Sequence, residues 1–270
     1  NLNYLINIYF QIENNTVFSH YNRKSNIIDL NPDGTNYDKL ISTLALNTQL
    51  FDGKLESNSQ IKYLYGYFKG EYDASENPLD TIVVNKEVRN TGMSFSQALK
   101  YNINDHSYVR ASYENTYRLP EQHELFGDNS FIVANYDLEP EESKNINLGY
   151  TFTQKKFGFE INSYYRNTKG LIRLKDLNQY QAMHLNLDNV RGIGVELQAK
   201  YEPVDQLYLS GNLTWNDFRL RSSRDPYLNN QHFRNARVAN MPFYYGNLSV
   251  AYNLQEIFKL STDLSFFWDY

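Results

Sequence analysis

Hydrophobic and polar residues alternate one by one along much of the chain. In 109–118 the odd positions are mostly apolar or aromatic, whereas the even positions are polar or charged. Successive side chains of a β-strand point to opposite faces, so this period of two predicts strands with one apolar and one polar face. The same alternation recurs in 146–152, 193–201 and 207–215.

The alternation predicts about eleven strands, each close to the roughly ten residues that a tilted membrane-spanning strand needs. No stretch has convincing helical periodicity, and none approaches the roughly 18 consecutive apolar residues of a membrane helix. The predicted strands lie at 2–12, 39–51, 57–71, 93–102, 107–118, 144–154, 157–168, 189–201, 206–218, 242–254 and 257–270.

Short and long connections alternate strictly between these strands. The short ones lie at 52–53, 104–106, 155–156, 203–205 and 255–256, and the long polar ones at about 13–38, 72–92, 119–143, 169–188 and 219–241. Compact soluble domains seldom carry five loops of about 20 residues, whereas outer-membrane barrels pair short periplasmic turns with long extracellular loops. The chain is therefore predicted to be all-β, an antiparallel up-and-down transmembrane β-barrel, with a soluble β-sandwich or β-solenoid as the alternative.

Aromatic composition favours the barrel over the sandwich. The 270 residues include 24 Tyr and 16 Phe, and many of the rings lie near the ends of predicted strands. Amphipathic rings favour membrane interfaces, whereas a sandwich has no need of aromatic residues at its strand ends.

Charge and motifs exclude several classes of function. The net charge of −5 and the lack of a basic stripe across the chain argue against a nucleic-acid partner. The lack of cysteine excludes disulfides and thiolate metal sites. We find no nucleophile elbow, phosphate-binding glycine loop, dinucleotide fingerprint or zinc motif, and therefore predict no enzyme, no cofactor and no metal site.

Several ordered motifs resemble the barrel of TonB-dependent outer-membrane receptors. Residues 117–128 read Tyr-Arg-Leu-Pro-Glu-Gln-His-Glu-Leu-Phe-Gly-Asp, and 135–141 read Asn-Tyr-Asp-Leu-Glu-Pro-Glu. The strand-ending Gly-Tyr at 149–150 and the Gly-Val-Glu at 194–196 follow in the family's order. The resemblance covers about 93–254 and is strongest to Bacteroidota versions.

The resemblance implies a 22-stranded barrel in the Gram-negative outer membrane, with an N-terminal plug that TonB pulls. Since no plug or TonB-contacting segment is visible, we expect 1–270 to be a partial barrel domain from an incomplete chain. The implied partners are outer-membrane lipid and lipopolysaccharide, the receptor's own plug, the TonB complex through that plug, and a small ligand. The implied function is uptake of a scarce nutrient, first a ferric siderophore; the alternatives are a SusC-like glycan importer and a passive porin or adhesin.

Charged residues within the strands are expected to face the lumen, because a Lys or Arg at mid-bilayer costs about 2–4 kcal/mol. They would either contact the plug or pair with one another along a solvated wall. The candidates are Arg110, Glu114, Arg118, Arg191 and Glu196, and the same reasoning applies to Glu160, Arg166 and Lys200.

The loop at 219–241 is rich in arginine and aromatic residues. Guanidinium groups bind carboxylates and phosphates in bidentate fashion, and rings stack on flat ligands, which would suit an anionic ferric siderophore. The alternatives are contact with lipopolysaccharide and plain solvation. The candidate residues are Arg219, Arg221, Arg224, Tyr227, His232, Phe233, Arg234 and Arg237.

Acidic residues cluster in the loop at 119–143. Their spacing fits neither a zinc motif nor an EF-hand, so we interpret them as surface charge, with an incidental Ca²⁺ site as the alternative. The cluster comprises Glu121, His123, Glu124, Asp128, Asp137, Glu139, Glu141 and Glu142.

Overall fold

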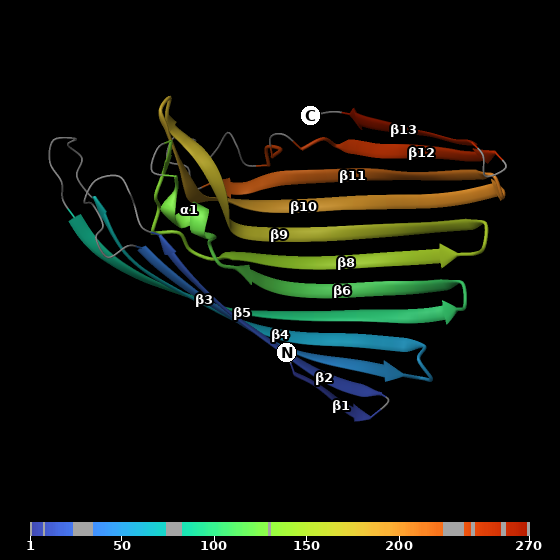
Figure 1. Cartoon of the computed structure of the whole chain (residues 1–270), viewed down its shortest axis with the longest axis horizontal. Coiled ribbons are helices and arrows are strands. Elements are labelled where there is room, and N and C mark those ends of the chain that lie inside the picture. Colours follow the sequence, from blue (N-terminus) through green and yellow to red (C-terminus); the bar gives the residue numbers. More distant parts are fainter. Residues whose placement is uncertain are drawn as a thin grey trace.

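A computed structural model describes residues 2–7, 9–23, 35–73, 83–128, 131–223, 235–238, 241–254 and 258–268. In these ranges the strands form one curved 13-stranded sheet, shown in Figure 1. The elements are β1 (Leu2–Asn7), β2 (Phe10–Arg23), β3 (Thr35–Leu50), β4 (Leu55–Asp73), β5 (Val83–Asn104), β6 (Ser107–Arg118), α1 (Gln122–Phe126), β7 (Ile132–Val133), β8 (Glu141–Thr153), β9 (Phe157–Asn178), β10 (Gln181–Val204), β11 (Leu207–Ser223), β12 (Tyr244–Leu254) and β13 (Phe258–Trp268).

The strands follow one another in sequence order across the sheet, each antiparallel to its neighbour. The exception is β7, which lies off this path and pairs in parallel with β10. Tight turns join β3 to β4, β5 to β6, β8 to β9 and β10 to β11 at one end, on the right of Figure 1. These features confirm the predicted all-β class and up-and-down order. Among the described residues, no helix is long and apolar enough to cross a membrane.

The strand boundaries correct the sequence prediction in four regions. The predicted strand 2–12 is two strands, because Asn7 pairs with Phe10 across a turn and Leu5 pairs with Gln11. Much of the predicted loops 13–38, 72–92 and 169–188 is strand, and β9 and β10 stay paired as far as Asn178 and Gln181. Beyond a bilayer both faces of a sheet meet water, so the hydrophobic alternation disappears while backbone pairing continues.

The two faces of the sheet differ as the alternation predicts. On the outward face of β8, Ile146 and Leu148 are 52% and 58% exposed. Between them, Asn147 faces the concave side and donates a hydrogen bond to Ser112 Oγ at 2.9 Å. Exposed aliphatic side chains on one face and hydrogen-bonded polar ones on the other are typical of a membrane barrel wall.

The buried core lies at the end of the sheet opposite the tight turns. It joins the inner face of β3 and β4 to the segment that links β6 to β8, which carries α1. A barrel wall needs no such core, so this cluster marks a segment folded into the barrel. Its members are Tyr37, Phe68, Leu125, Phe126, Leu138 and Ile172.

Candidate functional site

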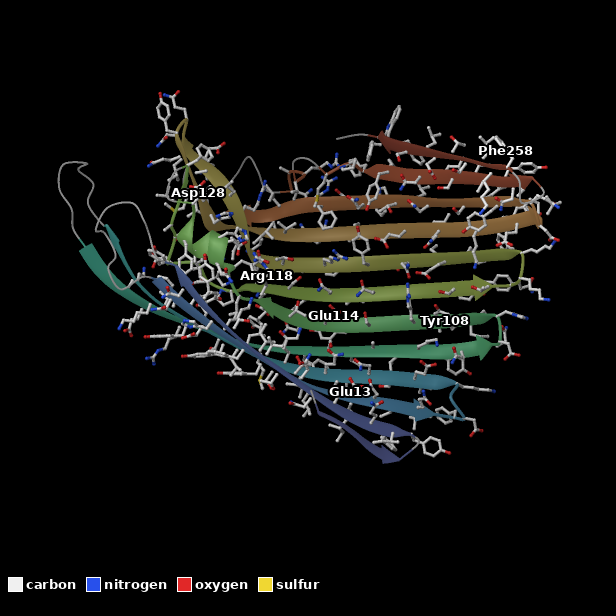
Figure 2. All side chains as sticks on the ribbon, in the orientation of Figure 1. Glu13, Tyr108, Glu114, Arg118, Asp128 and Phe258 are labelled. Atoms are coloured by element: carbon white, nitrogen blue, oxygen red, sulfur yellow. The ribbon has the colours of Figure 1, made fainter. Side chains whose placement is uncertain are left out.

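The concave face forms a polar hollow of about 820 Å³. Its walls are lined by side chains of neighbouring strands that bond one another in rows. Lys100 Nζ lies 3.0 Å from Glu56 Oε1, and Asn47 Nδ2 donates to Glu13 Oε1 at 3.1 Å. Figure 2 shows such side chains along the ribbon, with Tyr108, Glu114 and Arg118 labelled on β6.

Arg110 is part of the tightest group on this wall. Its Nη2 pairs with Glu160 Oε1 and donates to Asn162 Oδ1 at 2.8 Å. Gly149 makes room for the group, since a Cβ there would lie 2.4 Å from Asn162 Oδ1 and 2.8 Å from Arg110 Nε. The wall around Arg110 is therefore internally paired, as one of the two sequence interpretations expects.

Glu114 and Glu196 also line the hollows of the concave face. Within the described part of the chain, neither carboxylate forms an ion pair. Arg166 lies nearby, with its guanidinium carbon 4.7 Å from the centre of the Tyr164 ring. These two carboxylates therefore differ from Arg110, whose charge is paired with that of Glu160.

The prediction that Arg191 faces the lumen is wrong. In β10 its side chain lies on the same face as that of Ile193. The residue between them, Gly192, lies on the other face, against Phe218 in a hollow of the concave side. Arg191 therefore lies on the outward face. It escapes the cost of a charge at mid-bilayer because it is close to the end of the apolar belt.

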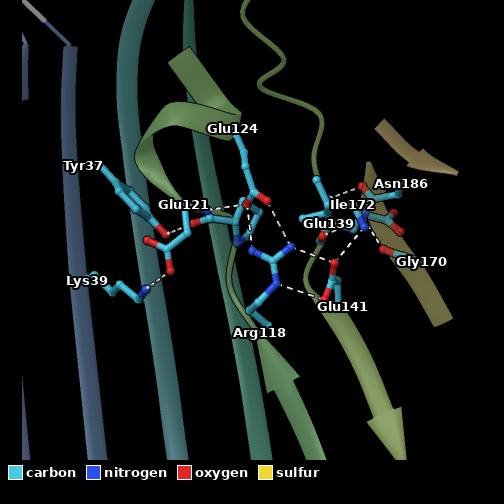
Figure 3. A network of polar contacts seen from close by, with 11 residues as sticks. Tyr37, Lys39, Arg118, Glu121, Glu124, Glu139, Glu141, Gly170, Ile172 and Asn186 are labelled. Atoms are coloured by element: carbon cyan, nitrogen blue, oxygen red, sulfur yellow. Dashed lines mark hydrogen bonds and ion pairs between the residues drawn. The ribbon is translucent and has the colours of Figure 1, made fainter. Parts of the chain in front are cut away.

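Arg118 binds two buried carboxylates at the end of β6 opposite the tight turns, as Figure 3 shows. Its Nη1 and Nη2 lie 2.8 and 3.1 Å from the oxygens of Glu124, and its Nε and Nη2 lie 2.9 and 2.6 Å from those of Glu141. Glu124 is 7% exposed and Glu141 8%. The interpretation of the acidic cluster as surface charge is therefore wrong for these two residues.

The carboxyl of Glu124 is held ionised. Burial alone would raise its pKa, but hydrogen bonds from Arg118 and from the Glu121 backbone, together with the Arg118 charge, outweigh burial. Its pKa consequently lies below its ordinary value. Glu124 thus serves as a fixed anion that caps α1 and binds Arg118.

Residues 119–140, which we call the mouth segment, are attached to the wall of β3 and β5. Tyr37 Oη donates to the Pro120 carbonyl at 2.9 Å, and Lys39 Nζ lies 3.3 Å from Glu121 Oε1. From β5, Asn90 donates to the Leu138 carbonyl at 3.3 Å. These contacts fold the segment inward rather than out into solvent.

A second set of bonds attaches the mouth segment to β9 and β10. Asn186 accepts from the Glu139 backbone at 2.8 Å and donates to the carbonyls of Glu139 and Gly170 at 2.9 and 2.8 Å. Glu141 accepts from the Ile172 amide at 2.7 Å. The segment therefore bridges opposite parts of the curved sheet.

Aromatic rings fill the space between the mouth segment and the wall. Phe68 stacks on Tyr136 with ring centres 4.6 Å apart, and Tyr21 stacks on Phe126 at 5.8 Å. Such pairs add about 0.5–1.5 kcal/mol each to the burial of their area. The mouth segment is thus packed as well as hydrogen-bonded.

Two histidines meet beside this cluster without forming a metal site. The rings of His123 and His184 are 5.6 Å apart and nearly perpendicular. Burial lowers the pKa of His184, which favours its neutral form. In the described ranges, no three His, Cys, Asp or Glu side chains are arranged to hold a metal ion.

The structure describes only part of the basic loop. Arg219 lies on the outward face, opposite Arg191, and its Nε is 2.7 Å from Asp217 Oδ2. Arg237 pairs with Arg219 through a β-bridge, and Arg221 is partly exposed. The other candidates lie outside the described residues: Arg224, Tyr227, His232, Phe233 and Arg234.

Sequence reasoning missed the residues that hold the mouth segment from other strands. Tyr37, Asn90 and Asn186 lie far from it in sequence and belong to no local motif. The motif itself carried a usable signal, because Glu three residues after Glu121 is the spacing of a capping box.

Comparison with known proteins gives one family and one fold. Residues 65–270 match the family model described as TonB dependent receptor-like, beta-barrel. A search of curated proteins finds no match.

Solved structures share the fold at low identity. The FrpB iron transporter from Neisseria meningitidis superposes with a TM-score of 0.69 at 11% identity, covering 96% of this chain and 40% of that one. The ferric yersiniabactin uptake receptor FyuA from Yersinia pestis gives 0.60 at 16%, covering 95% and 38%. BauA, the ferric preacinetobactin receptor from Acinetobacter baumannii, gives 0.65 at 13%, covering 97% and 41%. The chain therefore spans about 40% of the length of these structures.

Proposed function

Because this chain belongs to the TonB-dependent receptor-like β-barrel family, we propose that it forms part of the barrel wall of an importer for a ferric siderophore. The family places the chain in the outer membrane of Gram-negative bacteria, and its members are typically transporters rather than enzymes. The proposal for the whole receptor includes a plug inside the barrel and TonB acting on that plug.

The proposed class of substrate rests on the basic loop at 219–241. Siderophores present carboxylate, catecholate or hydroxamate oxygens around iron, and arginines with neighbouring rings bind such flat, oxygen-rich ligands. Arg219 and Arg237 lie on the outward face, so the proposal rests on Arg221, Arg224 and Arg234 with Tyr227 and Phe233. The similar structures described above are an iron transporter and two receptors for ferric siderophores, which supports the same class of substrate.

The plug would meet the wall at the unpaired carboxylates of the lumen. Glu114 and Glu196 have no ion-pair partner among the described residues, whereas Arg110 and Arg118 are already bound to glutamates. Basic groups on a plug would find their complement in Glu114 and Glu196. This narrows the predicted plug contacts to these two residues.

The test is uptake of ⁵⁵Fe-loaded siderophores of the citrate, catecholate and hydroxamate types by cells with and without the full gene. We expect one type to be lost on deletion, and the variant R221Q/R224Q/R234Q to lower its uptake about tenfold. A matched control, Lys69→Gln on β4, removes a cation outside the loop and should leave uptake unchanged. Loss of oligosaccharide uptake with normal iron uptake would instead assign the receptor to glycan import.

A further inference from the structure

Basic residues of neighbouring strands form a row on the outward face. Lys144 of β8 pairs with Asn167 of β9, Asn167 with Arg191 of β10, and Arg191 with Arg219 of β11. Arg219 in turn pairs with Arg237 through the β-bridge. We call Lys144, Arg191, Arg219 and Arg237 the cationic row; since strands lie about 4.8 Å apart, its part on β8–β11 spans about 14 Å.

The row lies at the upper edge of the apolar belt. The next outward-facing residues of β8, β9 and β10, two positions closer to the tight turns, are Ile146, Tyr165 and Ile193. They pair with one another across the three strands. Tyr165 is among the exposed large hydrophobic residues, as expected for a ring at the membrane interface. The cationic row therefore lies where the head groups of the outer leaflet begin.

Protein groups neutralise only part of this charge. Like charges directly opposite one another on a sheet repel, and the pairings of Arg219 with Arg191 and with Arg237 are of this kind. Asp217 binds Arg219, but among the described residues Arg191 has no acidic partner. Arg237 lies 3.4 Å from the centre of the Phe243 ring and donates to the Met241 carbonyl, and neither group carries an opposite charge.

At the end of the row on β8 and β9, too, the positive charge is only partly neutralised by acidic side chains. Glu142 is shared between Lys144 and Lys169 at 3.7 and 3.8 Å, which are long contacts for an ion pair. Both lysines remain about half exposed. The surface thus presents a net positive charge toward the membrane head groups.

We propose that the cationic row binds the phosphate groups of lipid A, the phosphorylated glycolipid of the outer leaflet. Arginine forks match phosphate geometry and lysines add point charges, so a row of both types suits closely spaced phosphates. The outward direction excludes the lumen and its substrate as the site of binding. The proposal rests on the outer-membrane location of the chain and is independent of which nutrient is imported.

The test is native mass spectrometry of the full receptor in non-ionic detergent, titrated with bisphosphorylated lipid A. The variant K144Q/R191Q should bind about 25-fold more weakly, at about fivefold for each cation lost. The charge-conserving variant K144R/R191K should stay within about threefold of the wild type. Lipid A stripped of both phosphates should bind poorly to every form.

The matched control K62Q/K200Q removes two cations that face the lumen, on β4 and on the same strand as Arg191. It should bind lipid A like the wild type. The proposal is overturned if K144Q/R191Q retains wild-type affinity, if K62Q/K200Q loses as much, or if phosphatidylglycerol competes as well as lipid A. Should K144Q/R191Q fail to show the heat-sensitive mobility of a folded barrel, Arg191→Gln alone gives the same decision with about a fivefold expected loss.

Siderophore uptake by the same variants separates this proposal from the proposed function. Lipid binding is measured without any siderophore, and uptake is measured without added lipid A. If a variant of the cationic row loses lipid A binding but still imports iron, the result supports the lipid A proposal and says nothing against the proposed substrate. If the wild-type receptor binds lipid A but imports no iron, the lipid A proposal stands and only the proposed substrate is contradicted.

Discussion

Arg118 and Glu141 face each other across β6 and β8 in two parallel hydrogen bonds of 2.9 and 2.6 Å. They are also register partners in the sheet, so the bonds join the first and last residues around the mouth segment. The same guanidinium binds Glu124 inside that segment. One side chain therefore fixes both the base of the mouth segment and its helix.

Replacing Arg118 should release the mouth segment without unfolding the wall. Breaking a buried pair costs about 3–5 kcal/mol, but the Arg118 side chain is 39% exposed, so solvent screening reduces the expected cost to about 1–3 kcal/mol. Arg118→Gln should increase amide hydrogen exchange in 119–140, while the strands exchange as in the wild type. Arg118→Lys should give an intermediate result, because one ammonium cannot form both bidentate contacts. Unchanged exchange in Arg118→Gln would contradict the network.

Acid should detach the mouth segment. The pKa of Glu124 in the folded protein lies below its ordinary value of 4.5, so ionisation stabilises the fold. This contribution is complete above about pH 4.5 and is lost as the pH falls through the lower folded-state pKa. Amide hydrogen exchange within 119–140, divided by the intrinsic exchange rate at each pH, should rise over that range.

The control for the acid effect is Glu124→Gln, which has no charge to lose. Its corrected exchange within 119–140 should already be high at pH 6 and should change little on acidification. A wild-type segment equally protected at pH 3 and pH 6 would show that Glu124 does not hold it.

Glycine is required at 127 but only convenient at 53. Both have positive φ, +59° and +81°, yet a Cβ at Gly127 would lie 2.0 Å from the Ile132 carbonyl oxygen, and one at Gly53 meets nothing within 4 Å. Gly127→Ala should open the turn that Asp128 closes on Ile132. Gly53→Ala should cost only about 1 kcal/mol of backbone strain. Hydrogen exchange at 125–135 compares the two, and equal effects would argue against the crowding at Gly127.

Loss of the unpaired luminal carboxylates should loosen a plug. In the full receptor, E114Q/E196Q should raise single-channel conductance in planar bilayers, because the wall then offers no charge to basic plug groups. Glu13→Gln is the matched control, since Glu13 faces the lumen and accepts a hydrogen bond from Asn47. Identical conductance in all three proteins would exclude Glu114 and Glu196 as plug contacts.

The sequence predicted the barrel wall well and its extracellular end poorly. Across the apolar belt, each residue of β8 or β10 faces either lipid or lumen, so hydrophobicity reports the strand directly. Above the belt this signal vanishes, and the strand ends near Arg23, Asp73 and Asn178 were predicted as loop. The bulges near Asp188 and Val190 lie where the alternation of hydrophobic and polar residues stops while the backbone pairing of β9 and β10 continues.

The candidate site was predictable only where it depends on local motifs. The motif around Arg118 and Glu124 was visible, but its inward fold depends on Tyr37, which is 83 residues from Pro120 in sequence. Arg191 was placed on the wrong face because a charge was assumed to avoid lipid, although at the rim of the belt it meets head groups instead.

The pairing of Arg118 with Glu141 has a consequence for how this protein changes over evolutionary time. β6 and β8 are neighbours in register up to that pair, so the wall is complete without the 22 residues between them. The residues that carry the family's motifs, 117–128 and 135–141, are bonded to other strands, so we expect them to be kept. Changes of length between these two motifs would remodel what the barrel shows to the outside while leaving the order and register of the wall strands unaltered.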